Sequence, residues 1–257
     1  MQIEIKDLCF GYYKNVPILN GINISIETGT ATTILGLNGC GKTTLIKLVA
    51  GLLKSTSGTI LINGKPILSM TDNERSKIIS YVPQIFSSKN SFTVKEYLLL
   101  ALSNQKGIFW LPSAVDEEKV KTFIANIGVD ENMLQRRVDE LSGGERQIII
   151  ICSALIQDAK VIILDEPTAA LDIKNQYMVL QFLKKCHREN GKTILLSTHD
   201  PNHALRLGGN TIALHNGKIL LHGESREIIK AENLKQIYGD NICNSKETDH
   251  NFITVKF

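Results

Sequence analysis

The chain has 257 residues, of which 43% are hydrophobic and 21% charged, and its formal net charge is +3. This is the composition of an ordinary globular protein, long enough for one domain with smaller lobes. The charge is far from the basic excess of a nucleic-acid-binding protein, so we expect no nucleic acid among the partners. Five cysteines without a C-x-x-C pair argue against a disulfide framework and predict a cytoplasmic location.

Neither a signal peptide nor a membrane span is evident. Residues 1–10 alternate between apolar and polar side chains, whereas a signal peptide would place a charged segment before an apolar one. No apolar run approaches the roughly 18 residues that suggest a membrane-spanning helix. If the protein works at a membrane, another chain must hold it there.

The amino-terminal part predicts short strands. Residues 2–10 and 22–27 alternate as half-buried strands do, and the pair Asn20-Gly21 interrupts them. Residues 58–64 indicate a further strand pair with a tight-turn signal at Asn63-Gly64. We therefore expect an antiparallel sheet here.

Helical periodicity follows and predicts an inserted helical subdomain over approximately residues 90–158. The segments EYLLLAL and AVDEEKVKTFIANIG carry most of this pattern. The run Ile148–Cys152 fits two structures. Its four β-branched residues favour a strand, while the cap pattern before it favours a buried helix.

Four short apolar runs lack alternation, as strands buried on both faces of a parallel sheet should. They end at Gly36, Gln84, Glu166 and His199, and a helical segment lies between successive runs. Ligands bind at the carboxyl ends of the strands in open α/β sheets. These four ends should therefore meet at one crevice.

The carboxyl-terminal part, approximately residues 208–257, predicts a hairpin, a helix and a tail. The pair Asn216-Gly217 marks the hairpin turn, and residues 225–239 form one closing helical pattern.

A phosphate-binding loop is predicted at GLNGCGKT, Gly36–Thr43, which matches G-x-x-x-x-G-K-[ST] between a strand and a helix. Backbone amides of such a loop wrap phosphates, and the amino end of the helix adds partial positive charge. Lys42 would reach the β- and γ-phosphates, and the Thr43 hydroxyl a magnesium ion.

Two adjacent acids close the strand VIILDE. Asp165 would lie beside the magnesium ion, and Glu166 would point toward the γ-phosphate and orient or deprotonate water. Alone, adjacent acids at a strand end would more simply cap the following helix; beside a complete phosphate loop the catalytic interpretation is preferred.

The stretch LSGGERQ contains a capping box, in which Ser142 is the N-cap and Glu145 reaches back to its amide. The capping box leaves Gly143 and Gly144 unexplained, because each glycine in a helix costs about 1 kcal/mol relative to alanine.

The phosphate loop, LSGGERQ and VIILDEP, in this order, resemble the ATP-binding cassette ATPases over nearly the whole chain. The resemblance implies one α/β domain over residues 1–257. Its core would be a RecA-like P-loop NTPase with a parallel sheet, joined by an antiparallel β subdomain and the inserted helical subdomain. It also implies ATP as substrate, Mg²⁺ as cofactor and a head-to-tail homodimer.

Site residues follow from the same resemblance, position by position. The ATP-binding residues would be Tyr12, which stacks on adenine, and Gly36, Leu37, Asn38, Gly39, Cys40, Gly41, Lys42, Thr43 and Thr44. The metal would be held by Thr43, Gln84 and Asp165, and catalysis would rest on Lys42, Glu166 and His199. The signature that caps the γ-phosphate of the other chain would be Ser142, Gly143, Gly144 and Glu145, and Asp172 would lie in the loop that crosses the dimer.

Three looser stretches resemble the ATPases of importers for iron chelates, haem, cobalamin or molybdate: GIFWLPS with VDEEKV, LDIKNQ and HDPNHAL. They imply a permease, a periplasmic or extracellular binding protein that acts indirectly, and a peripheral place on the inner face of the cell membrane. The uptake of a metal chelate is the preferred function. The alternatives are an importer of molybdate or another substrate, an exporter, or a soluble ATPase of the same family.

Three residues need a separate account. Ser153 stands where relatives usually carry arginine, so a support to the helical lobe would be missing. Cys40 is either a thiol whose pKa the helix amino end lowers, which would allow redox inhibition, or simply a small residue. Trp110 would belong to a permease interface or, more simply, to a small local core.

Overall fold

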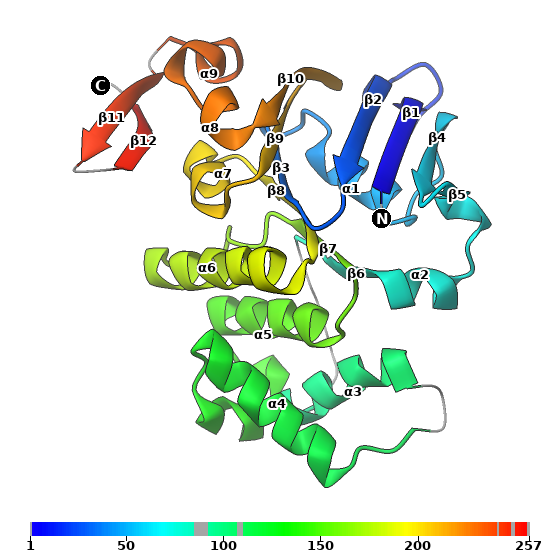
Figure 1. Cartoon of the computed structure of the whole chain (residues 1–257), viewed down its shortest axis with the longest axis vertical. Helices are drawn as coiled ribbons and strands as arrows, with labels where there is room; N and C mark the ends of the chain where they lie inside the picture. Colours follow the sequence, from blue (N-terminus) through cyan, green and yellow to red (C-terminus); the bar gives the residue numbers. More distant parts are fainter. Residues whose placement is uncertain (1, 85–91, 107–109, 241, 248–249, 256–257) are drawn as a thin grey trace.

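Two sheets and a group of helices form the layers of the computed structural model, which describes residues 2–84, 92–106, 110–240, 242–247 and 250–255. Figure 1 shows the antiparallel sheet and the central sheet in the upper half. The helices α3 (Val94–Lys106), α4 (Ala114–Ile127) and α5 (Gly143–Ile156) build the lower end. Short elements complete the first half of the chain: Ile67–Ser69, α2 (Asp72–Ile78), Glu131–Gln135 and Val138–Glu140.

The amino-terminal sheet has the strand order β2-β1-β4-β5. Its strands are β1 (Gln2–Phe10), β2 (Leu19–Glu27), β4 (Ser57–Ile62) and β5 (Lys65–Pro66). Both neighbours of β1 run antiparallel to it, which confirms the predicted antiparallel sheet. Alternation explains which face is inside, because Ile3 and Ile5 are almost fully buried while Glu4 between them is not.

The central sheet has the strand order β10-β9-β3-β8-β7-β6. Its strands are β3 (Ala31–Leu35), β6 (Ile79–Val82), β7 (Val161–Asp165), β8 (Thr193–Thr198), β9 (Asn210–His215) and β10 (Lys218–Glu224). All pairs are parallel except the hairpin β9–β10. The four apolar runs of the sequence are therefore four neighbouring parallel strands, as predicted.

Both faces of the central sheet are covered, which explains why its strands do not alternate. Along β7, Val161 and Ile163 pack into the apolar cluster that contains α1 (Lys42–Val49) and the amino-terminal sheet. Ile162 and Leu164 pack into the cluster of α5 and α6 (Ile173–Asn190) on the opposite face. A strand buried on both faces gains stability from every side chain.

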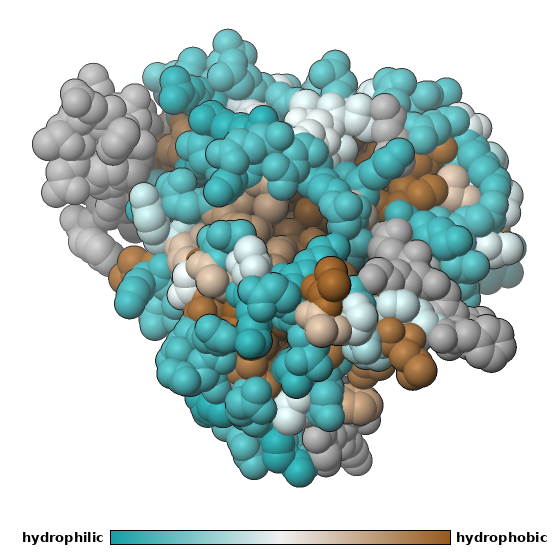
Figure 2. All heavy atoms as spheres, turned by 60° about the horizontal axis from the view of Figure 1, so that its bottom comes forward, coloured by the Kyte–Doolittle hydropathy of each residue, from teal (hydrophilic) through white to brown (hydrophobic). Residues whose placement is uncertain are grey.

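The ambiguous run Ile148–Cys152 is helical, in the middle of α5. Every residue from Gln147 to Ile156 is buried, so packing on all sides of the helix overrides the strand propensity of the isoleucines. Figure 2 turns this helical end forward and shows a mainly hydrophilic surface with separate apolar patches.

The carboxyl-terminal part differs from the predicted single helix. The helix α7 (Pro201–Leu207) precedes the β9–β10 hairpin, and two short helices, α8 (Ser225–Ile228) and α9 (Ala231–Tyr238), follow it. The extended backbone of Lys230 (φ −123°, ψ 146°) separates α8 from α9 and lets Ile228, Ile229 and Leu234 enter one apolar cluster.

A second hairpin, β11 (Ile242–Glu247) and β12 (His250–Val255), replaces the irregular tail that the sequence suggested. Among the described residues, no helix has both the length and the apolar character needed to cross a membrane.

Candidate functional site

The predicted phosphate loop connects β3 to the amino end of α1. Two of its glycines are required by the geometry. A Cβ atom on Gly36 would collide with the carbonyl oxygen of Leu214 and lie 2.6 Å from Cys40 Sγ. Gly41 has φ 109°, in the left-handed region that side chains disfavour. The loop therefore keeps its backbone close to the neighbouring strand and its amides free of side-chain cover.

Lys42 is folded back into this loop. Its Nζ donates hydrogen bonds to the carbonyl oxygens of Gly36 (3.0 Å) and Leu37 (3.1 Å), and lies 3.1 Å from Glu166 Oε1. The Lys42 and Glu166 side chains are only 4% and 8% exposed. A buried charge is tolerated when it is paired and hydrogen-bonded, and this ammonium group has both kinds of partner.

Asp165, at the end of β7, is fully buried and connects three elements. Its Oδ1 accepts hydrogen bonds from Thr43 Oγ1 of α1 (3.0 Å) and Ser197 Oγ of β8 (2.6 Å). The Ser197 hydroxyl also accepts the Glu166 N–H at 2.9 Å. The other carboxylate oxygen, Oδ2, is buried without a hydrogen-bond partner among the described residues. A buried, unpartnered carboxylate oxygen is costly and well suited to a cation.

Sequence reasoning missed Ser197. The signal is present, because the polar residues Ser197 and Thr198 follow the apolar run ILL in β8, but only the parallel register β7–β8 places Ser197 opposite Asp165. Its hydroxyl holds both acids of the VIILDE motif in place.

Glu166 has a left-handed backbone with φ 45°, which costs a non-glycine residue on the order of 1 kcal/mol or more. In this conformation each of the two carboxylate oxygens of Glu166 has its own partner. Oε1 faces Lys42, and Oε2 lies 3.0 Å from His199 Nδ1. The His199 side chain is 55% exposed, so it covers Glu166 from the solvent side. The structure thus brings Lys42, Thr43, Asp165, Glu166 and His199 together, as the convergence of strand ends predicted.

The capping box at the start of α5 is confirmed. Glu145 N–H donates to Ser142 Oγ (3.3 Å), and Ser142 N–H donates to Glu145 Oε2 (2.9 Å). Arg136 adds a hydrogen bond to Glu145 Oε1 at 2.7 Å. The hydrogen bonds from Ser142, together with Arg136, lower the pKa of Glu145 to about 2. The helix start is therefore well defined without any contribution from the glycines.

The two signature glycines differ in their surroundings. A Cβ on Gly143 would meet no atom within 4 Å, and its φ is not positive, so the fold of this chain does not require glycine there. A Cβ on Gly144 would lie 3.3 Å from the carbonyl oxygen of Ala170, a close contact. Among the described residues, no hydrogen bond connects Ser142–Glu145 with the phosphate loop. Within one chain the signature and the phosphate loop are separate features.

Thr44, also a predicted ATP-binding residue, is buried in the first turn of α1, whereas three further predicted site residues lie at the surface. Tyr12 is 52% exposed and packs edge-to-face on Phe10, with ring centroids 4.9 Å apart. Gln84 is exposed and follows β6, at the same edge of the sheet as Glu166. Asp172 is the N-cap of α6, where its Oδ1 accepts the Asn175 N–H at 2.7 Å. Within the described parts of the chain, no hydrogen bond or ion pair joins these three side chains to Lys42, Thr43, Asp165, Glu166 or His199.

The surroundings of Cys40 contradict a low pKa. The side chain is buried, and burial raises the pKa of the thiol above its usual value, against smaller lowering effects of Lys42 and the backbone. The lowered thiol pKa, one of the two alternatives for Cys40, is therefore wrong, and the preferred account, a small buried residue, is supported.

Ser153 and Trp110 both belong to the helical lobe. Ser153 Oγ donates to the Ile150 carbonyl of its own helix, at 2.8 Å, and is hydrogen-bonded to the Tyr97 side chain of α3. The support expected from an arginine is therefore replaced by a serine contact. Trp110 packs against the main apolar cluster, which favours the local core. Residues 107–109 of GIFWLPS lie outside the described residues.

Comparison with known proteins agrees with this geometry. Residues 19–169 match the family described as ABC transporter. The iron(3+)-hydroxamate import ATP-binding protein FhuC of Bacillus subtilis is 34% identical over 237 residues, which are 92% of this chain and 87% of that protein. The ferric enterobactin transport ATP-binding protein FepC of Escherichia coli is 33% identical over 238 residues, 93% of this chain and 87% of that protein.

Solved structures give the same fold. A metal-chelate type ABC transporter in an inward-facing conformation has a TM-score of 0.82 at 27% identity, covering 99% of this chain and 97% of that one. The dimeric ABC transporter cassette MJ0796 has a TM-score of 0.79 at 28% identity, covering 87% of this chain and 99% of that one. The predicted P-loop NTPase fold is thereby confirmed, and this chain belongs to the ABC transporter family as one of its ATP-binding, ATP-hydrolysing cassettes.

Proposed function

We propose that this chain hydrolyses ATP to drive the import of a metal chelate through a membrane permease. The observation that carries the proposal is the buried network in which Lys42, Asp165 and Glu166 meet at the end of β7. The names of the relatives support the importer branch, because FhuC and FepC are import proteins for iron(3+)-hydroxamate and ferric enterobactin. The substrate would be an iron–siderophore, haem or cobalamin type of chelate.

ATP would bind along the phosphate loop, residues 36–44, with its adenine against Tyr12. The amides at the amino end of α1 would hold the phosphates. Lys42 now bonds to two backbone carbonyls and to Glu166. Phosphate oxygens carry more negative charge than carbonyl oxygens, so bound ATP would draw the ammonium group away from the loop and from Glu166.

The residues present fit Mg²⁺. Asp165 Oδ2 is a buried carboxylate oxygen without a hydrogen bond among the described residues. The Thr43 hydroxyl donates a hydrogen bond to Oδ1 of the same carboxylate. Mg²⁺ prefers one or two carboxylates together with waters and substrate phosphates, which matches so small a set of protein ligands. Gln84 would join from the end of β6. When bound, the ion would neutralise charge on the phosphates during transfer.

Glu166 would act as general base. Once Lys42 turns to the phosphates, Oε1 becomes free to accept a proton from the attacking water, while the His199 contact at 3.0 Å keeps Oε2 in place. The left-handed backbone of Glu166 and its amide bond to Ser197 fix the direction of the carboxylate. His199 would therefore orient the base from the solvent side.

The signature would act in trans in a head-to-tail homodimer. The bare backbone at Gly143 has no function inside this chain, since a Cβ there would contact nothing. An anion of another chain, approaching the amino end of α5, would explain it. Ser142, Gly144 and Glu145 shape that helix start, and Asp172 would lie at the same interface. ATP would bring two copies together, and hydrolysis would release them.

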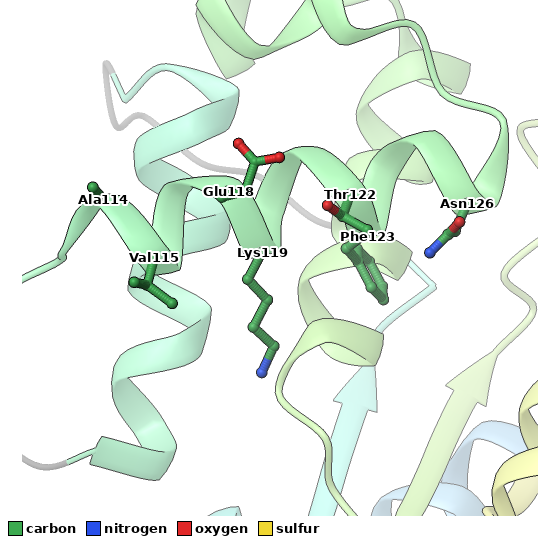
Figure 3. Close-up of a pocket in the computed structure, with 7 residues that line it drawn as sticks. All are labelled: Ala114, Val115, Glu118, Lys119, Thr122, Phe123 and Asn126. Carbon is green, nitrogen blue, oxygen red and sulfur yellow. The ribbon is translucent and has the colours of Figure 1, made fainter.

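The permease would contact the helical subdomain, approximately residues 90–158, and so hold the chain on the inner face of the membrane. A shallow pocket of about 680 Å³ lies along α4. Figure 3 shows Val115, Lys119 and Phe123 pointing to the same side of this helix. Val115, which lines the pocket, and Leu111, three residues before α4, are 77% and 82% exposed, and a permease would cover these apolar side chains. The binding protein outside the membrane would act only through the permease.

The test uses Glu166→Gln, which keeps the size of the side chain but cannot accept a proton. With Mg²⁺ and ATP, this variant should elute from gel filtration as a dimer, and with ADP as a monomer. The matched control is Glu166→Gln combined with Lys42→Ala, which should stay monomeric. A monomer with bound ATP would contradict the dimer mechanism.

The proposed role in the import of a metal chelate is tested by uptake experiments in cells. Deletion of the chain should abolish uptake of a ⁵⁵Fe-labelled chelate, and wild type but not Glu166→Gln should restore it. Uptake that persists without the chain for ferric siderophores, haem and cobalamin alike would contradict the metal-chelate assignment.

A further inference from the structure

The carboxyl-terminal segment contacts the loop that carries His199. In Figure 1 the hairpin β11–β12 lies at the edge of the molecule beside α9 and near α7. Residues His199–Asn202, called the His199 loop here, follow β8 and include the first turn of α7, so they lie between the catalytic network on one side and this segment on the other.

Three hydrogen bonds join the two parts. Tyr238 Oη, at the end of α9, donates to the carbonyl oxygen of His199 at 2.9 Å. The Asn202 side chain pairs with the backbone of Ile253 in β12: its Nδ2 donates to the Ile253 carbonyl (3.1 Å), and its Oδ1 accepts the Ile253 N–H (2.9 Å). Both ends of the loop are therefore fixed by residues that lie far away in the sequence.

A cavity of about 450 Å³ lies beside the loop, and its lining includes His199, Pro201, Tyr238 and Ile253. The loop also has local hydrogen bonds, because the Asp200 N–H donates to Thr198 Oγ1 (3.1 Å) and the Asn202 N–H donates to Asp200 Oδ1 (2.8 Å). The hydrogen bonds of Tyr238 and of the Asn202 side chain are the ones that join the loop to the carboxyl-terminal segment.

The position of the loop matters because the link to Glu166 is a single contact. His199 Nδ1 lies 3.0 Å from Glu166 Oε2, and more than half of the His199 side chain is exposed. A hydrogen bond of this kind is lost when its atoms move apart by roughly 0.5–1 Å. We propose that Tyr238 is a positioning residue, which holds the backbone of His199 so that its imidazole keeps Glu166 in the direction needed to activate water.

The Tyr238 hydroxyl is suited to this task. Burial raises the pKa of Tyr238 above its usual value, so the hydroxyl stays protonated and remains a donor throughout the neutral range. It bonds to the backbone and leaves the imidazole free to use Nδ1 for Glu166. The carboxyl-terminal segment thereby becomes part of the ATPase site, although it supplies no group that touches ATP.

This inference rests on the proposed catalytic role of Glu166 and His199. Its simpler rival is that Tyr238 only stabilises the end of the chain. The two accounts differ in what they change. A stabilising contact affects the melting temperature, whereas a positioning contact lowers kcat and leaves the affinity for ATP unchanged, because the phosphate loop is untouched.

The experiment measures ATP hydrolysis and thermal unfolding of the full-length chain with Tyr238→Phe, which removes only the hydroxyl. We expect kcat to fall about three- to tenfold, the factor associated with one net hydrogen bond, with KM for ATP within about twofold of wild type. The matched control is Tyr97→Phe, another partly buried tyrosine, which bonds to Ser153 in the helical lobe. It should change stability to a similar extent and leave kcat as in wild type.

Two further variants show whether Tyr238 acts through His199. Asn202→Ala should lower kcat in the same direction, because it releases the other end of the loop. In a His199→Ala background, Tyr238→Phe should cause no additional loss. An unchanged kcat in Tyr238→Phe, or the same fold loss with and without His199, would overturn the inference. A wild-type chain that fails to hydrolyse ATP would instead contradict the proposed function.

Discussion

Gly143→Ala tests whether the glycine at this position is needed for the folding of its own chain or for the binding of a second chain. In this chain a Cβ at position 143 would meet no atom within 4 Å, and the backbone is helical, so the substitution adds no strain. Alanine also loses less backbone freedom than glycine on folding. Together these effects should stabilise the protein by roughly 0.5–1 kcal/mol. For a chain of this size that is a rise in melting temperature of about 1–4 °C.

Activity should change in the opposite direction. Suppose that the backbone amides after Ser142 bind the γ-phosphate of the ATP held by another copy. The methyl group of the alanine side chain at position 143 would then lie beside these amides and would keep the phosphate away from one of them. Removal of a single preorganised donor from a transition state lowers kcat by about 100-fold. A variant that is more stable and much less active would show that the glycine serves something outside its own chain.

The assay pairs thermal unfolding without nucleotide with ATPase rates and with gel filtration in the Glu166→Gln background. Asn73→Ala is the control, because it adds an alanine to the first turn of α2, an exposed helix that carries none of the proposed site residues. That control should leave kcat and dimer formation unchanged. A Gly143→Ala protein that hydrolyses ATP and dimerises like wild type would refute the reasoning, because nothing outside the chain would then need the bare backbone.

Three other outcomes follow from single residues. N-ethylmaleimide at pH 7.5 should modify the more exposed Cys9 before the buried Cys40, as mass spectrometry would show, and ATPase activity should survive the modification of Cys9. Trp110→Ala should lower stability by about 2 kcal/mol, less than a fully buried tryptophan would cost, without changing the ATPase rate of the isolated chain. The pKa of Glu145 is lowered to about 2 from 4.5, so its contribution to stability is complete above pH 4.5 and is lost as the pH falls toward 2. Glu145→Gln should therefore show a smaller loss of stability than wild type over that interval in acid unfolding curves.

Much of the fold could be predicted because the central strands are buried on both faces. The lack of alternation in VIILDE indicated a parallel sheet, and a parallel sheet brings its carboxyl ends together. This is why Lys42, Asp165, Glu166 and His199 could be placed at one site before any coordinates were known. A pattern of burial and a rule of topology were sufficient for these residues.

Other features depend on tertiary contacts that no local pattern encodes. Ser197 meets Asp165 only through the register of two strands. For Ile148–Cys152 the local signals disagreed, and burial on all sides of the helix agrees with the capping box rather than with the strand propensity of the isoleucines. The helix amino end suggested a low pKa for Cys40, but burial has the larger effect and raises it. The contact between Tyr238 and His199 joins residues 39 positions apart, and the predicted closing helix that contains Tyr238 carried no signal for this partner.

If Glu166 is the general base, its ion pair with Lys42 would prevent it from activating water while no ATP is bound. In this arrangement the ammonium group covers one oxygen of the proposed base, and His199 covers the other. A carboxylate with both oxygens engaged is a poor acceptor for a proton from water. In the proposed mechanism, an anion on the phosphate loop would attract Lys42 and free Oε1, and it would give the lysine a new partner in place of the one it leaves. The base would therefore become available when phosphates occupy the loop, and the same lysine that binds the substrate would control when Glu166 can act.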